Sequence, residues 1–159
     1  MSNLLITPHF SWNEIEVSPT AKVRGINNRV PQALEINVAR MAQFMECVRA
    51  LLGRNPIRVT SWYRSWELNE AVGGSTTSMH TKGLAVDFKA PEGHSLQDAF
   101  DEIRLSTLPY DQVIIERTRD GASWIHIGLT EEGEPRRMAL DASGDVLGGS
   151  MVYRRILEG

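Results

Sequence analysis

Two histidines and one aspartate stand where they could bind a metal ion. His80 lies in a glycine-bounded loop, and Asp87 lies in the apolar run 84–88. His126 lies in a second apolar run, 124–129. Two neutral imidazoles and one carboxylate are a common ligand set for catalytic zinc, whose fourth tetrahedral position is left to water. These residue types predict a zinc site if the fold brings the three side chains together.

Both apolar runs alternate in the way that β-strands do. In 84–88 the even positions are large and apolar and would face a core, which leaves Asp87 on the opposite face. In 124–129 the odd positions are apolar, so His126 also faces away from the core. A carboxylate on an otherwise apolar strand needs a partner. If the two strands share a sheet, Asp87 and His126 converge, and the loop of His80 can reach them.

A structural role is the alternative for each of these residues. A single histidine is more often a satisfied surface or core residue than a ligand, and spacing alone does not decide between the two. His9 and His94 stand in no comparable context. Geometry provides a strict test, because two nitrogens that each bind one ion at about 2 Å cannot lie more than roughly 6 Å apart.

Composition indicates a single domain with a substantial core. The chain has 159 residues, of which 42% are hydrophobic. A net charge of -3 argues against a nucleic-acid partner, which would need clustered Lys and Arg. No run approaches the roughly 18 apolar residues of a membrane span, and residues 1–6 break at Thr7 and Pro8 before a secretory signal can form. We expect a monomer made in a cytoplasm, without membrane insertion.

The elements that would position the site predict an α+β fold. The clearest helix is 31–52, where apolar residues recur at alternating intervals of four and three. Shorter helices are expected at 66–72 and after Ser95. Strands are expected at 57–60, 84–88, 113–116, 124–129, 136–140 and 151–156. This order predicts a small central antiparallel sheet with helices packed on one side.

Both ends are expected to belong to one domain, 1–159. Residues 1–30 indicate an irregular N-terminal arm, in which Ser11 and Glu14 have the spacing of a capping box. Residues 131–159 indicate a C-terminal hairpin extension at the sheet edge, with 145–149 as its loop. The single cysteine, Cys47, is expected to be a packing residue of the long helix.

Several ordered motifs resemble the M15 zinc peptidases. The motif consists of Ser78, His80, Gly83, Ala85 and Asp87, followed by Trp124 and His126. It is similar to the signature of D-alanyl-D-alanine carboxypeptidases and phage L-alanyl-D-glutamate endopeptidases, which share a fold with the hedgehog signalling domain. The similarity continues through 59–65 and 110–116, and it covers roughly residues 10 to 130.

The resemblance implies an enzyme with Zn²⁺ as cofactor and the peptidoglycan stem peptide as partner. The bond cut would lie either between L-Ala and a D-residue or at D-Ala-D-Ala. The implied ligands are His80, Asp87 and His126. The implied substrate contacts are Ser78, Arg64 and Trp124. A guanidinium such as that of Arg64 suits a substrate carboxylate or carbonyl.

The general base is where this sequence departs from part of the family. Many members carry an acid three residues before the last ligand, whereas this chain has Ser123 there. Amide hydrolysis still needs a proton carrier. Glu116 and Asp120 are the two candidates, and Glu116 is preferred because a strand holds a side chain more firmly than a loop tip does. If neither serves, the chain is a noncatalytic metal-containing module that binds cell wall.

Biological placement follows from what the sequence lacks. A small chain with neither a signal peptide nor a separate wall-binding repeat fits a phage endolysin or a virion-associated lysin. Such a protein is made in the host cytoplasm and acts on the wall after release, or it is carried in a virion.

Overall fold

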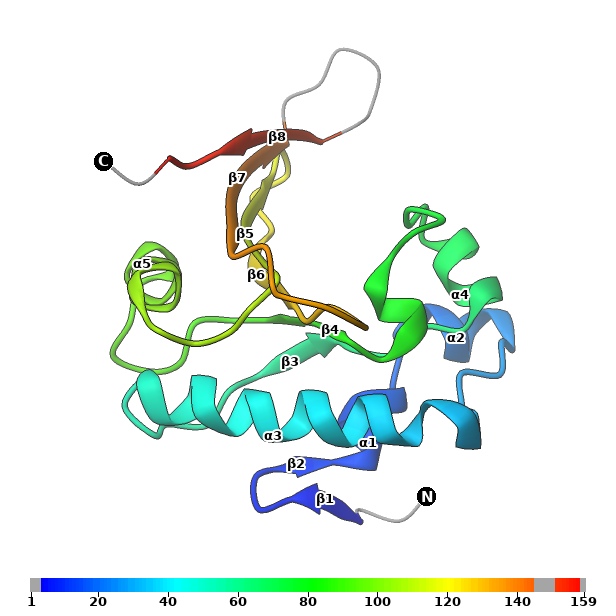
Figure 1. Cartoon of the computed structure of the whole chain (residues 1–159). Helices are drawn as coiled ribbons and strands as arrows, with labels where there is room; N and C mark the ends of the chain where they lie inside the picture. The colour runs from blue at the N-terminus through cyan, green and yellow to red at the C-terminus, as the bar shows by residue number, and fades with distance from the viewer. Residues whose placement is uncertain (1–3, 145–150, 158–159) are drawn as a thin grey trace.

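A six-stranded sheet forms the centre of the computed structural model, which describes residues 4–144 and 151–157 (Figure 1). The strand order is β3-β4-β6-β5-β7-β8. The strands are β3 (Val59–Ser61), β4 (Ala85–Phe88), β5 (Gln112–Thr118), β6 (Ser123–Gly128), β7 (Met138–Gly144) and β8 (Val152–Arg155). Neighbouring strands are antiparallel except β5 and β7, which are parallel. The predicted α+β class is confirmed, with a mixed rather than a purely antiparallel sheet.

The parallel pair results from the route of the chain after β6. Gly128, at the end of β6, lies opposite Gln112, at the start of β5. The next strand begins with Met138, which also pairs with Gln112. Residues 129–137 therefore cross the starting end of β5, and β7 must run in the same direction as β5.

Helices and short strands surround the sheet. The helical elements are α1 (Trp12–Glu16), α2 (Pro19–Arg24), η1 (Gln32–Leu34), α3 (Glu35–Leu51), α4 (Trp66–Ala71), η2 (Met79–Lys82) and α5 (Leu96–Leu105). A small separate sheet pairs β1 (Leu5–Thr7) with β2 (Phe10–Ser11). Figure 1 shows α5 on one side of the upright strands and α4 on the other, with α3 beneath them.

The long helix confirms the predicted apolar stripe. Its buried residues include Val38, Met41, Met45 and Val48, which follow the expected spacing of three and four. The first turn is the 3-10 helix η1 rather than α-helix. Cys47 is exposed, so the prediction that it packs inside was wrong. Cys47 lies about 100° around the helix from Val48, which places its side chain outside the buried stripe.

The two faces of the sheet carry different clusters. The main core lies on the side of α3 and α5 and includes Val86, Phe88, Val113, Ile115, Ile125 and Ile127. On the opposite face, Ala85 and Asp87 were expected to point away from the core, yet both are buried. Cover on this face comes from η2, which contacts β4. A second, smaller apolar cluster on the same face consists of Ile114, Leu140 and Ala142, with Met138 and Met151 packed against it.

The structure describes most residues of the two extensions. The N-terminal arm is more regular than expected, because it contains β1, β2, α1 and α2. The predicted capping box is present, with the Ser11 backbone N donating to the Glu14 carboxylate at 2.8 Å. The predicted C-terminal hairpin is also present, as β7 and β8 at the sheet edge. Its predicted loop, 145–149, lies outside the described residues.

Candidate metal centre

The short helix η2 delivers His80 to the face of β4. Ser78 caps this helix, since its hydroxyl accepts from the His80 backbone N at 3.4 Å. Gly83 ends it in a left-handed conformation with φ 73°. A Cβ on Gly83 would lie 2.6 Å from Cγ2 of Val38, so both the backbone and the space at this position require glycine.

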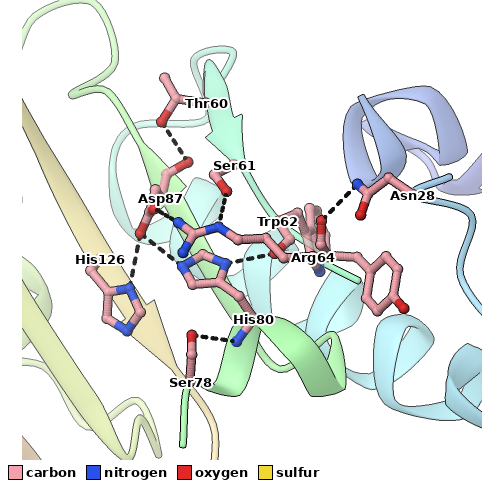
Figure 2. A network of polar contacts seen from close by, with 10 residues as sticks. Asn28, Thr60, Ser61, Trp62, Arg64, Ser78, His80, Asp87 and His126 are labelled. Carbon is pink, nitrogen blue, oxygen red and sulfur yellow. Dashed lines mark hydrogen bonds and ion pairs between the residues drawn. The ribbon is translucent and has the colours of Figure 1, made fainter. Parts of the chain in front are cut away.

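The other two candidate ligands are cross-strand neighbours. Asp87 on β4 is directly opposite His126 on β6, so both side chains point to the face that η2 covers. His126 Nδ1 lies 2.9 Å from Asp87 Oδ1, and His80 Nε2 lies 3.2 Å from the same oxygen. Figure 2 shows the three side chains converging. The predicted meeting of His80, Asp87 and His126 is therefore present.

These atoms have the spacing that zinc needs. One candidate ligand atom from each residue lies within 4.8 Å of the other two. Two ligand atoms at tetrahedral zinc lie about 3.4 Å apart, given bond lengths near 2.0–2.2 Å. The observed separations of 2.9 and 3.2 Å from Asp87 Oδ1 are close to this value. The nitrogens of the two imidazoles are therefore close enough to bind one ion.

A main-chain carbonyl fixes which nitrogen of His80 is available. His80 Nδ1 lies 2.6 Å from the backbone oxygen of Trp62, which can only accept, so Nδ1 carries the proton. Nε2 of the neutral ring then presents a lone pair to the Asp87 carboxylate. Burial lowers the pKa of His80, which favours that neutral ring. Two facing acceptors need a cation between them, and this donor set fits a divalent metal ion.

Arg64 holds the second oxygen of the Asp87 carboxylate. Its Nη2 lies 3.0 Å from Asp87 Oδ2, and its Nε donates to the Ser61 hydroxyl at 3.0 Å. Burial opposes ionisation of Asp87, but its two histidine neighbours outweigh burial and keep its pKa well below the ordinary value. Asp87 therefore remains a carboxylate that can bind a cation. The predicted contact of Arg64 with substrate stays a prediction.

The N-terminal arm braces the segment that carries Arg64. The side-chain amide of Asn28 donates to the Tyr63 carbonyl at 3.0 Å, and its oxygen accepts from the Ser65 backbone N at 2.7 Å. The Arg64 backbone N in turn donates to the His80 carbonyl at 3.1 Å. Hydrogen bonds thus connect the N-terminal arm to the segment of Arg64, and that segment to the helix that carries His80.

Glu116 and Trp124 extend the site along the same sheet face. They are opposite each other in β5 and β6, two residues from Ile114 and His126 respectively. Burial raises the pKa of Glu116; the Asp87 charge adds to this rise, while His126, a hydrogen bond from Trp124 and Arg64 oppose it. Glu116 is thus a partly buried acid near the candidate ligands, with a proton affinity higher than usual.

Asp120, the alternative base, occupies a different position. It is exposed in the turn between β5 and β6, where its carboxylate accepts from the Thr118 hydroxyl and from the Ala122 backbone N. The last cross-strand pair before this turn is Arg117 with Ser123. Asp120 therefore lies farther along the hairpin from His126 than Glu116 does, and its observed contacts are those of a turn residue.

The other two histidines lie away from the centre in ion pairs of their own, and Ser78 supports the centre through the ligand helix. His9 pairs with Glu46 at 2.8 Å, and His94 pairs with Glu102 at 3.2 Å. Within residues 4–144 and 151–157, the only group of three or more potential metal-binding side chains is that of His80, Asp87 and His126. The hydroxyl of Ser78 is engaged in capping η2, and its predicted contact with substrate stays a prediction.

Sequence reasoning missed the groups that orient the ligands. The Trp62 carbonyl and the Ser61 hydroxyl fix His80 and Arg64, but neither belongs to a residue type that signals a metal site. A main-chain carbonyl has no sequence signature of its own. The only available signal was the strand predicted at 57–60, and the sequence did not say that it pairs with the strand of Asp87.

A His-Asp-His centre on one face of a mixed sheet, with a carboxylic acid beside it, is typical of hydrolytic metalloenzymes. Residues 8–128 match the family model described as Peptidase M15. The match spans more than half of the chain, which therefore belongs to the Peptidase M15 family of metallopeptidases. No curated protein shows a significant match to the sequence. No helix in 4–144 or 151–157 combines the length and apolarity needed to cross a bilayer.

Proposed function

We propose that this metallopeptidase uses zinc to hydrolyse a stem-peptide bond of bacterial peptidoglycan. The convergence of His80, Asp87 and His126 carries the proposal, because these side chains form a candidate three-ligand site in a chain of the M15 family. Membership in a peptidase family supports a peptide substrate. The restriction to peptidoglycan stem peptides rests on the resemblance of the sequence motifs.

The chain's own groups would hold both the ion and the substrate. Bound zinc supplies a Lewis acid and activates water near neutral pH. Trp62 and Arg64 orient His80 and Asp87, so the ligands need little rearrangement to bind the ion.

Glu116 is the group that we propose carries the proton. A general base must accept a proton from water and then deliver it to the leaving nitrogen, which requires a pKa nearer to neutral than that of an ordinary carboxyl group. Burial shifts the pKa of Glu116 in that direction. Its position in the strand register also fixes it beside Trp124 on the face of the ligands.

A pair of matched variants tests this assignment. Glu116→Gln should lower the rate of peptidoglycan hydrolysis by about 10²-fold or more, the usual share of general acid–base catalysis. Asp120→Asn should leave the rate within about twofold, because Asp120 only caps an exposed turn. The measurements are the turbidity of purified peptidoglycan, with and without a chelator, and mass spectrometry of the released muropeptides. Zinc content is measured in both variants.

Three outcomes separate the alternatives. Hydrolysis that persists in Glu116→Gln but is lost in Asp120→Asn transfers the role to Asp120. A zinc-loaded parent that sediments with peptidoglycan but releases no fragments supports the noncatalytic binding module. That alternative arises because Ser123 stands where many family members carry an acid. Hydrolysis by the parent that a chelator abolishes supports the zinc peptidase.

A phage role is part of the same proposal. A lysin made in the host cytoplasm, or carried in a virion, would use a site of this kind on the wall. Lysis that depends on permeabilising the inner membrane of cells that express the chain would support release as an endolysin.

A further inference from the structure

One row of side chains links the candidate metal centre to the C-terminal hairpin. Trp124 pairs with Glu116, Glu116 with Ala142, and Ala142 with Tyr153. Directly opposed residues in a sheet share a face, so all four lie on the face of His126. Tyr153 is therefore on the site face, although it is 25 residues beyond the last residue of the family match, at 128.

The residue between Glu116 and Tyr153 leaves room for their side chains. Ala142 has only a methyl group and is fully buried. Neighbouring strands are about 4.8 Å apart, so the backbones of Glu116 and Tyr153 are separated by about 10 Å, a gap that a tyrosine and a glutamate side chain can largely span. Tyr153 nevertheless stays 52% exposed. About half of the residue's surface is thus open to a ligand.

The phenol of Tyr153 is a hydrogen-bond donor at neutral pH, because even an unperturbed tyrosine has a pKa of about 10. Burial of part of the ring raises the pKa of Tyr153, and the charges of Glu116 and Asp87 raise it further. This influence accords with the register, which places Tyr153 on the sheet face of both carboxylates. A protonated phenol donates to a carbonyl oxygen.

A buried apolar cluster supports the sheet face between the candidate ligands and the hairpin. Ile114 is opposite His126, Leu140 and Ala142 continue the cluster on β7, and the partly buried Met138 and Met151 pack against it. These apolar side chains offer no hydrogen bonds to the main chain of a peptide, so a donor at the far edge of this face has a large effect on how a peptide lies.

We propose that Tyr153 is a substrate-binding residue, whose hydroxyl donates to a main-chain carbonyl of a peptide that runs from the metal centre past Glu116 toward β8. The proposal rests on the proposed function, and it defines the substrate more closely. From β6 to β8 is about 14 Å, and a tyrosine side chain covers about 6 Å of that distance. The remaining span equals about two or three extended residues. The preferred substrate continues at least that far beyond the bond that is cut.

Peptides of graded length test this subsite. Two series, based on the stem peptide, extend by one to four residues on one side or the other of the scissile bond. In one series the parent should show a rise in kcat/KM of about tenfold between one and three residues, as expected for one added hydrogen bond with its contacts. Tyr153→Phe should remove most of this rise through KM, with kcat unchanged. Val152→Ala, on the opposite face of β8, should retain it.

A binding measurement separates this inference from the catalytic proposal. Calorimetry with a long peptide whose scissile amide is replaced by a reduced bond should give a Kd about tenfold higher for Tyr153→Phe than for the parent. Zinc content and thermal unfolding should be equal in the two proteins. A parent that cuts nothing, while this difference in Kd persists, rejects hydrolysis and supports the subsite. A parent that cuts peptides without regard to length, or equal length preference in Tyr153→Phe, overturns the subsite alone.

Discussion

The two ends of the central sheet are built in opposite ways. At the β4 and β6 end, both faces are covered, and His80 and Asp87 are 2% and 7% exposed, with the Trp62 carbonyl holding one and the Arg64 guanidinium the other. At the other end, all four residues of β8 are exposed. The first arrangement restrains side chains by packing and hydrogen bonds, whereas the second leaves side chains open to a ligand. Holding an ion and receiving a peptide make opposite demands on burial.

Removal of a ligand should have the largest effect. His126→Ala should lower peptidase activity by at least about 10³-fold, because metal-ion catalysis contributes several kcal/mol of transition-state stabilisation. Zinc content, measured by elemental analysis, should fall with the activity. His94→Ala is the matched control and should retain both, since His94 pairs with Glu102 away from the centre. Full zinc content in His126→Ala would show that the ligand set is wrong.

A methyl group at Gly83 should be the next most damaging change. Gly83→Ala combines an unfavourable left-handed backbone with a contact of 2.6 Å to Val38, and we expect a loss of about 2–4 kcal/mol in the free energy of unfolding. Gly121→Ala in the β5–β6 turn has φ 89° but nothing within 4 Å of the added Cβ. It should cost only about 1 kcal/mol. Denaturant unfolding measures both. Equal losses would mean that the ligand helix is no more tightly packed than the turn.

The smallest expected effect concerns the base of the C-terminal hairpin. Arg136 Nη2 lies 2.6 Å from Asp111 Oδ2, and hydrogen bonds from Arg136 are the main cause of a lowered pKa at Asp111. A carboxyl group with a lowered pKa contributes stability above its unfolded pKa of about 3.9, and that contribution disappears as the pH falls through the folded value. Asp111→Asn should cost about 1 kcal/mol at pH 7, because Arg136 is more than half exposed.

The pH dependence provides the check on this last change. Unfolding of the parent and of Asp111→Asn is followed at pH 7 and at pH 3. The difference between the two proteins should shrink at the lower pH, where the parent's carboxylate begins to take up its proton. A difference that is the same at both values would mean that the ion pair adds no charge-dependent stability to the hairpin.

The candidate site was predictable where periodicity and residue type coincide. Asp87 and His126 stand out because each interrupts an apolar alternation, and His80 because its loop ends in glycine. Arg64 was identified by its motif, but its contact with Asp87 depends on the β3–β4 pairing, which no local pattern specifies. The Trp62 carbonyl was not predictable, since main-chain groups have no sequence signature.

The fold shows the same division. Helix α3, the capping box of α1 and the helix after Ser95 follow from local spacing and were predicted. The parallel pairing of β5 with β7 depends on the path of residues 129–137, which is a long-range property. The error at Cys47 arose because apolar neighbours along the chain do not share a side of a helix. Tyr153 gained significance only from the register of three strand pairs.

Trp62 ties the interior of the protein to the chemistry of its surface. Its ring is fully buried in the main core and donates to the Gly83 carbonyl at 3.1 Å, while its own carbonyl accepts from His80. A substitution that shifts this one indole would displace the backbone atom that selects the imidazole tautomer. Packing of the core and orientation of a candidate metal ligand therefore depend on the same residue, and a change in one changes the other.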